Sequence, residues 1–331
     1  MGWAVVRRVG AALVVLLLVS LISFLVLHVL PGDAAALELG LDSSPEKLAA
    51  LRASMGTDEP LPVQYLDWVG GVLTGDWGQS SMYGRDVLSV IGPTLPVTLS
   101  VSALAILIAV VVSGVLGVAG ALHPGSAVDV VARTVIQVAS ALPGFLLAIL
   151  LMLLFSMTLR LLPTSGYVSL SQGFGPWLAS ITLPAVTLAV GQMGQLTRII
   201  RSSTLSSLSR DYMLATQVKG LSRARSVLAY GVRGALVAPL TVAGLQLAKL
   251  LGGAVIVESV FSLPGLGRLM LTAVEQRDVM LLQGVIVVVT LAVVLATLLA
   301  DLLVMAVDPS MRGSGRLRAR GAAGRGGRDG Y

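Results

Sequence analysis

Long apolar stretches alternate with short polar segments along most of this chain. A bilayer core of about 30 Å is crossed by about 20 helical residues, and six stretches reach that length. They span residues 9–30, 97–122, 134–159, 178–200, 235–257 and 281–307. The pattern therefore predicts an all-α integral membrane protein with six transmembrane helices.

The placement of the basic residues predicts which way these helices run, because Lys and Arg collect in cytoplasmic segments. Arg7 and Arg8 precede the first span, whereas residues 31–96 carry nine acidic and three basic residues. Six arginines follow the last span: Arg312, Arg316, Arg318, Arg320, Arg325 and Arg328. We therefore expect both termini in the cytoplasm and residues 31–96 outside it.

This topology divides the chain into three parts. Residues 1–96 hold the first transmembrane helix and an extracytoplasmic segment with a short helix after Pro45. We interpret the first helix as a retained anchor, because its apolar run exceeds a signal-peptide core of about 7–15 residues. Residues 97–308 form a five-helix core with a cytoplasmic loop at about 201–234. The Gly- and Arg-rich residues 309–331 are a basic, disordered tail, which either only sets topology or also lies on anionic lipid.

The composition excludes several kinds of site. The chain is 55% hydrophobic and 12% charged, and it has no cysteine, which removes disulfides, thiol nucleophiles and Cys-based metal sites. His28 and His123 are far apart, and we find no clustered metal ligands, catalytic triad or GxxxxGK[ST] phosphate loop. We expect no catalytic residue, metal or cofactor on this chain, so ATP chemistry would come from another polypeptide.

A polar, basic segment interrupts the apolar pattern between the fourth and fifth spans. Residues 198–233 carry seven basic residues and one acid, Asp211, while Leu214, Val218 and Leu221 recur at helical spacing. This pattern predicts a short amphipathic helix at the inner membrane surface, available to a cytoplasmic partner. An ordinary basic loop that only sets topology is the alternative.

Short motifs distributed along the chain support a more specific interpretation. They are Pro31-Gly32-Asp33, Pro60-Leu61-Pro62-Val63-Gln64-Tyr65, Gly75-Asp76-Trp77-Gly78, Leu162-Pro163-Thr164-Ser165-Gly166-Tyr167, Lys219-Gly220-Leu221-Ser222, a segment from Glu258 to Gly267, and Asp308-Pro309. Together they resemble the permease subunits of ABC importers, in the form of the dipeptide/oligopeptide/nickel subfamily. The resemblance covers nearly the whole chain except the tail.

The resemblance implies that the basic loop is the EAA coupling loop, whose helix docks into a groove on an ATPase subunit. Leu214 stands at the Glu position of the general motif, which is a departure, and Gly220 stands at its Gly position. The residues expected to couple to the ATPase are Asp211, Leu214, Ala215, Thr216, Val218, Lys219, Gly220 and Leu221.

The resemblance also implies the assembly and the activity. It predicts a type I importer permease in the bacterial cytoplasmic membrane, paired with a second homologous permease, two ABC ATPases that bind ATP and Mg, and an extracytoplasmic solute-binding protein. The transported solutes would be di- or oligopeptides or a related small solute such as a nickel complex or glutathione. Nucleic acid is not an expected partner.

Lys249 is the most unusual residue of the predicted spans. A lysine at mid-membrane costs about 2.5–3.5 kcal/mol on insertion scales, so it should face protein or water. Lys249, with Gln246 one turn away, is a candidate for the translocation path and leans towards a substrate with a carboxylate. A structural ion pair or a side chain that reaches the interface is the alternative.

Other positions have structural or gating interpretations. Glu258, Phe261, Pro264 and Gly265 are expected on the outer gate or the side facing the binding protein. Two small-residue stripes predict close helix packing. They are Gly244, Ala248 and Gly252, and Ser113, Gly117 and Ala121. Asp301 is expected to be an interfacial carboxylate with a partner.

Two other functional classes stay open from the sequence. A secondary transporter driven by an ion gradient would show inverted repeats and acidic residues near the midplane, and a membrane enzyme would show a catalytic cluster within its spans. Neither pattern is found in the chain.

Overall fold

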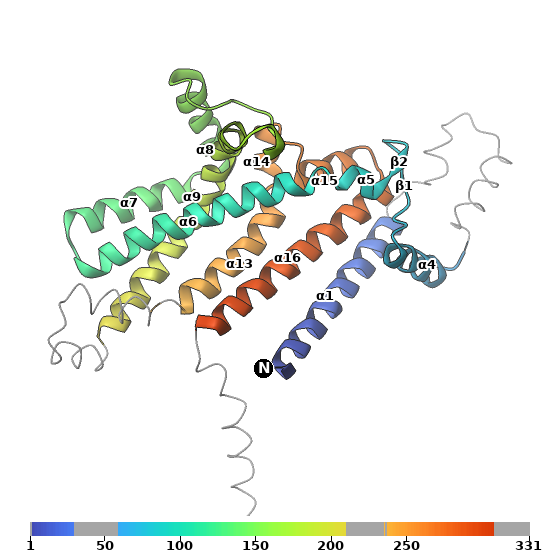
Figure 1. The fold of residues 1–331 in the computed structure, drawn as a ribbon, viewed down its shortest axis with the longest axis horizontal. Coiled ribbons are helices and arrows are strands. Elements are labelled where there is room, and N and C mark those ends of the chain that lie inside the picture. Colours follow the sequence, from blue (N-terminus) through green and yellow to red (C-terminus); the bar gives the residue numbers. More distant parts are fainter. Residues whose placement is uncertain (1, 30–58, 210–234, 236, 308–331) are drawn as a thin grey trace, which may run out of the picture.

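The computed structural model describes residues 2–29, 59–209, 235 and 237–307. In these ranges the chain is almost entirely helical (Figure 1). The long elements are α1 (Gly2–Val29), α6 (Leu95–Leu122), α9 (Phe174–Leu208), α13 (Val237–Gly253) and α16 (Val279–Val307). The shorter ones are α4 (Leu61–Thr74), α5 (Val87–Ile91), α7 (Ala127–Ala141), α8 (Gly144–Leu151), a π-helical turn (Met152–Thr158), a 3-10 turn (Leu170–Gln172), α14 (Val255–Val260) and α15 (Leu266–Glu275). Strands β1 (Gln79–Ser80) and β2 (Arg85–Asp86) pair antiparallel as a small hairpin.

Four described helices are long and apolar enough to cross a membrane: Val6–Val26, Leu95–Leu122, Phe174–Leu208 and Val279–Ala306. They confirm the first, second, fourth and sixth predicted spans. Two shorter apolar helices, Gly144–Thr158 and Val237–Gly253, correspond to the third and fifth. The first residue of α1 and the last of α16 lie on the same side of the helix bundle, as the charge pattern predicts (Figure 1).

The third predicted span differs from the prediction of one helix over residues 134–159. It is divided into α7 and α8 at Pro143, whose φ of −56° and ψ of 135° are those of extended backbone. Proline disfavours helical backbone at the preceding residue, so α7 ends at Ala141. Pro143 then caps α8, where its missing N–H costs nothing.

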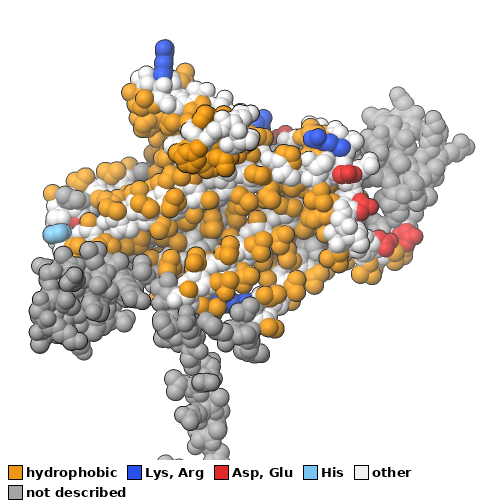
Figure 2. Space-filling view, in the orientation of Figure 1, with side chains coloured by type: hydrophobic (Ala, Val, Ile, Leu, Met, Phe, Trp, Pro, Cys, Tyr) orange, Lys and Arg blue, Asp and Glu red, His pale blue; other side chains and the backbone are white. Residues whose placement is uncertain are grey.

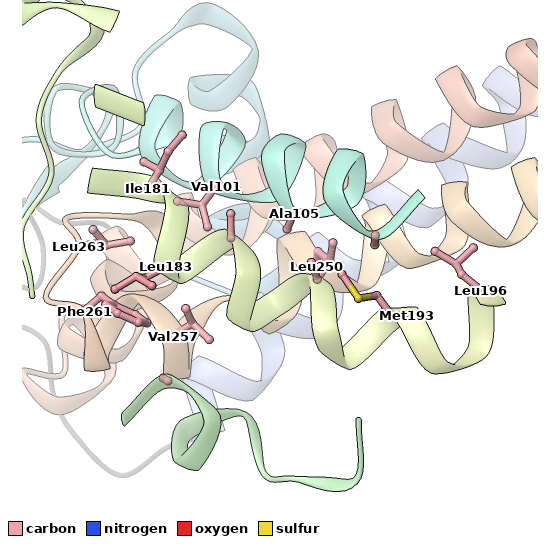
Figure 3. Packing of buried hydrophobic residues seen from close by; sticks show 14 of the residues in the cluster. Val101, Ala105, Ile181, Leu183, Met193, Leu196, Leu250, Val257, Phe261 and Leu263 are labelled. Carbon is pink, nitrogen blue, oxygen red and sulfur yellow. The ribbon is translucent and has the colours of Figure 1, made fainter. Parts of the chain in front are cut away.

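The core lies between α6, α9, α13 and α14 (Figure 3). Small residues bring α6 and α9 close together: a Cβ added at Gly117 would lie 2.8 Å from Ile200, and Ser113 Oγ donates to Met193 O at 3.3 Å. On α13, a Cβ at Gly244 would lie 2.1 Å from Ala300 of α16. Both predicted packing stripes therefore contain close helix contacts, although Gly252 has no neighbour within 4 Å.

The N-terminal helix is attached along the outside of this core. Arg8 Nε of α1 lies 3.1 Å from Asp301 Oδ2 of α16, so Asp301 has the interfacial partner that was expected. Near the other end of α1, Phe24 contacts Tyr65 edge-on with ring centroids 5.4 Å apart, and Ser20 shares a 2.8 Å hydrogen bond with the Tyr65 hydroxyl. These contacts join α4 to α1.

Candidate functional site

The predicted coupling residues, from Asp211 to Leu221, lie outside the described residues. What the structure describes is the helix that leads into them. α9 continues to Leu208, eight residues beyond the predicted end of the fourth span. Arg198 and Arg201, which were grouped with the basic loop, therefore belong to a helix that is continuous with the membrane-spanning part of α9.

The two predicted path residues, Gln246 and Lys249, lie one turn apart on α13 and differ in exposure. Gln246 is 1% exposed and donates from Nε2 to Gln192 O of α9 at 3.3 Å, while its Oε1 has no hydrogen-bond partner among the described residues. Lys249 is exposed, and among the described residues it forms no ion pair. Gln246 thus belongs to the seam between α9 and α13, and Lys249 lies on the exposed surface one turn away.

The four predicted outer residues are brought together in one turn that links α14 to α15. Glu258 and Phe261 are buried at 0% and 1% exposure, and Gly265 is also buried, whereas Pro264 is exposed. The Phe261 side chain packs with Val257, Leu183 and Leu263 in the core (Figure 3). Pro264 is therefore the member of this set whose side chain is available to another protein.

Glu258 is the centre of a polar network within that turn. Thr98 Oγ1 of α6 donates to Glu258 Oε1 at 2.6 Å, and the N–H of Arg268 donates to Oε2 at 3.0 Å. Thr98 Oγ1 also accepts the N–H of Leu266 at 2.8 Å. Glu258 comes directly after the apolar residues of the fifth span. Burial raises the pKa of its carboxyl group, and the hydrogen bond from Thr98 opposes that shift.

Gly265 is required by the same network. A Cβ at this position would lie 2.3 Å from the Glu258 carboxyl carbon, so any larger residue would displace the carboxylate from its donors. The network joins α6, α14 and α15 at a single buried point, and it holds the turn closed over the core.

A second buried carboxylate anchors the outer hairpin. Asp278 precedes α16 and is 1% exposed. Its Oδ1 accepts the N–H of Leu281 at 3.0 Å, and its Oδ2 accepts Ser80 Oγ at 2.5 Å and the N–H of Met82 at 3.1 Å. Asp278 thus caps α16 and holds the β1–β2 hairpin on its end, next to the outer turn.

At the inner end, Asp129 joins α7 to α9. It is 4% exposed, and Arg201 binds it with two contacts of 3.2 Å, Nε to Oδ1 and Nη2 to Oδ2. Arg133 Nη2 lies 3.0 Å from Oδ2. The N–H of Gly125, which donates to Oδ2 at 3.0 Å, together with Arg201 and Arg133, holds the pKa of Asp129 below its ordinary value.

Asp129 was not among the predicted site residues, although the sequence contains a signal for it. Ser126-Ala127-Val128-Asp129 fits the S-x-x-[DE] capping pattern, and Ser126 Oγ accepts the Asp129 N–H at 3.2 Å. The pattern marks the start of α7, but it does not reveal that Arg201, 72 residues later, completes the site. Arg201 lies seven residues before Leu208, the last residue of α9.

No metal cluster accompanies these polar sites: within the described ranges, no group of three or more His, Cys, Asp or Glu side chains could hold a metal ion. The polar groups instead hold helix ends, one at the inner side and two at the outer side.

Comparisons with known proteins agree over nearly the whole chain. Residues 113–313 match the family model described as Binding-protein-dependent transport system inner membrane component, and residues 1–102 match the one described as Binding-prot-dependent transport system membrane comp, N-term. The chain is 36% identical over 312 residues to the Probable peptide ABC transporter permease protein y4tP of Sinorhizobium fredii, covering 94% of this chain and 100% of the relative. It is 35% identical over 308 residues to the Glutathione transport system permease protein GsiC of Salmonella typhimurium, covering 93% and 98%.

The fold is also found among solved structures. A structure of the MetNI methionine ABC transporter in inward-facing conformations aligns with a TM-score of 0.55 at 17% identity, covering 67% of this chain and 97% of the other. At this identity the likeness concerns the fold. It supports the helical permease architecture that the sequence predicts.

Proposed function

The chain belongs to the family of binding-protein-dependent transport system inner membrane components, and from this we propose that it forms the translocation path of an ATP-driven importer for peptides. It is a multi-pass permease of the cytoplasmic membrane. The observation that carries the substrate class is the match to a peptide permease along that relative's full length. Glutathione, a small peptide derivative named for a second relative, fits the same class; a nickel complex is the other candidate solute.

The proposed importer requires partners that supply what this chain lacks. ATP and Mg would bind to two ABC ATPase subunits, because this chain has no phosphate-binding loop. A second homologous permease would complete the path, and an extracytoplasmic binding protein would deliver the solute. Pro264 and the β1–β2 hairpin, both on the outer side, are the surfaces we assign to contact with that binding protein.

We assign ATPase coupling to the loop after α9. Leu214, Val218 and Leu221 would enter a groove of the ATPase as the apolar face of a helix, with Asp211, Ala215, Thr216, Lys219 and Gly220 around them. Asp129 and Arg201 support this assignment, since they connect α9 rigidly to α7. Movement of the loop would then reach both helices.

The coupling proposal is tested by copurification from native membranes. A tagged chain should bring down an ATPase, and a Leu214→Asp/Leu221→Asp variant should lose it while keeping the second permease. A Ser206→Asp variant, which adds a charge on the exposed face of α9, is the control and should retain the ATPase. Failure of the wild-type chain to retain any ATPase, under conditions that preserve the second permease, would rule the proposal out.

A further inference from the structure

One face of α9 is exposed and polar over its inner half. Gly191, Gln195, Arg198, Ser202 and Ser206 recur three or four residues apart and are all exposed. Beyond Phe174, α9 exposes no large hydrophobic side chain in its described length. This face is unsuited to lipid, because polar side chains in the hydrocarbon core are costly unless they face protein or water.

The other long helices have the opposite kind of surface. α6 exposes Leu99, Leu107, Val111 and Val115, and α16 exposes a similar aliphatic row. A groove of about 710 Å³ between α6, α13 and α16 is lined almost entirely by aliphatic residues. The face drawn in Figure 2 is correspondingly covered with hydrophobic side chains, which suits contact with lipid tails.

The polar face of α9 lies on the side of the molecule away from α6. α6 contacts α9 through Met193 O and Ile200, which are on the opposite side of the helix from Gln195 at 100° per residue. On α13, Leu247 and Leu251 point into the groove shared with α6. Lys249 is exposed on a different face.

The exposed faces of the two helices are neighbours. Gln246 and Gln192 join α13 to α9, and Lys249 follows Gln246 by three residues. Gln246 is at the centre of the predicted span 235–257, so Gln192 has the same depth. At a rise of about 1.5 Å per residue, Lys249 lies about 4.5 Å from Gln246 towards the outer side. Arg198 lies about 9 Å from Gln192 towards the inner side.

The same face of α9 is covered at its outer end. Ser180, Pro184 and Thr187 precede Gly191 at the same three- and four-residue spacing, and all three are buried. Ser180 Oγ accepts the N–H of Val168 from the segment before α9 at 3.3 Å. The face is therefore closed towards the outside and open from about mid-membrane inwards.

The charges on this open face have one sign. Arg198 and Lys249 are exposed, and neither forms an ion pair with a described residue. The sequences of α9 and α13 contain no acidic residue, and Asp129, which contacts α9, is already bound by Arg201 and Arg133. Neither cation has an acidic partner among the described residues, and a cation attracts an anionic group more strongly where the dielectric is lower than that of bulk water.

We propose that this face of α9 and α13 lines the translocation path from about mid-membrane to its inner end, and that Lys249 and Arg198 guide the carboxylate of the solute along it. Lys249 binds the carboxylate near mid-membrane, and Arg198 receives it nearer the cytoplasm. The proposal rests on the assigned transport function and specifies its substrates as solutes with a carboxylate. Peptides with a free C-terminus have that group.

The absence of cysteine from the chain allows a direct test. Single variants Gln195→Cys and Ser202→Cys, and the lipid-facing controls Leu107→Cys and Leu295→Cys, are placed in the complete importer in inside-out vesicles. Each is treated with membrane-impermeant methanethiosulfonates, one anionic and one cationic, and labelling is measured on the isolated chain. We expect Gln195→Cys and Ser202→Cys to react and both controls to stay unmodified.

The charge assignment is tested by the ratio of the two reagents. The rate of each reagent at Gln195→Cys is divided by its rate with a free thiol in solution. The normalised rate of the anionic reagent should be about tenfold higher than that of the cationic reagent. Adding Lys249→Met and Arg198→Met should abolish that preference, whereas Leu247→Met, on the groove side of α13, should leave it intact. Labelling of Gln195→Cys no faster than of Leu107→Cys would overturn the path, and a ratio unchanged by both charge removals would overturn the carboxylate role.

Transport gives an independent measurement. Lys249→Met should lower ATP-driven uptake of a dipeptide about tenfold without changing subunit assembly or the affinity of the binding protein, and Leu247→Met should transport normally. Unchanged uptake by Lys249→Met would refute its role. If the chain is not part of an ATP-driven importer, no ATPase should copurify, while Gln195→Cys is still labelled as expected. That result differs from those that would overturn the path or the role of Lys249.

Discussion

The contact between Gly244 and Ala300 gives a quantitative test of the helix packing. A Cβ on Gly244 would lie 2.1 Å from the Ala300 Cβ, whereas carbon atoms in contact are about 3.5–4.0 Å apart. Gly244→Ala must therefore move α13 and α16 apart by about 1.5 Å. Overpacking of this kind costs about 1–3 kcal/mol, and the helix propensity of Ala returns up to about 1 kcal/mol.

We expect the net loss to lower the Tm of the purified complex by a few degrees. Gly252→Ala, on the same helix but with nothing within 4 Å, is the matched control and should be neutral or slightly stabilising. Gly244→Ala combined with Ala300→Gly should recover most of the loss, with a coupling of about 0.5–3 kcal/mol in the double-mutant cycle. Equal stability of the Gly244→Ala and Gly252→Ala variants would show that the contact between Gly244 and Ala300 does not limit how closely α13 and α16 pack.

Three further predictions concern the polar sites. Asp129→Asn should lower the Tm at neutral pH. Because the pKa of Asp129 is held below its ordinary value of 3.8, the stabilisation by its carboxylate is fully present above pH 3.8 and is lost as the pH falls through the lower folded pKa. In a series of melting curves, the Tm difference between wild type and variant should therefore begin to shrink only below pH 3.8. Thr98→Val leaves the buried Leu266 N–H without its acceptor and should cost about 1–3 kcal/mol, while Thr98→Ser keeps the Tm near wild type. Ser80→Ala removes the donor to Asp278 and should increase tryptic cleavage after Arg85 several-fold on the outer face.

Each of these has a result that contradicts it. A Tm difference for Asp129→Asn that persists unchanged at pH 3 would show that the carboxylate charge is not what stabilises α7 against α9. Equal melting of Thr98→Val and Thr98→Ser would deny a role for the hydroxyl. Unaltered cleavage of the Ser80→Ala variant would mean that the hairpin does not depend on Asp278.

Much of the fold follows from hydropathy alone. The helices near residues 9–30, 97–122, 178–200 and 281–307 were predictable because runs of about 20 apolar residues have one common explanation in a bilayer. The division at Pro143 was less visible, because apolar residues continue on both sides of it. The extension of α9 to Leu208 was missed because its last turns are polar, and hydropathy detects contact with lipid rather than helix formation.

The site was predictable where local sequence defines it. The turn from Glu258 to Gly267 was identified as one unit, and the structure explains Gly265 by its contact with the Glu258 carboxyl group. The partners Thr98, Arg201 and Ser80 lie 160, 72 and 198 residues from the carboxylates they bind. Such pairings depend on how the helices pack, which one sequence does not specify. The exposure of Lys249 beside the polar face of α9 also required the packed bundle.

The most direct test of the account is the energy source of uptake. The complete importer, with its binding protein, is reconstituted in vesicles, and accumulation of a labelled dipeptide is measured with ATP supplied on the cytoplasmic side or with an imposed proton or sodium gradient. We predict uptake that requires ATP and persists when ionophores collapse the gradients. Uptake that follows an ion gradient without ATP would contradict it and would identify a secondary transporter.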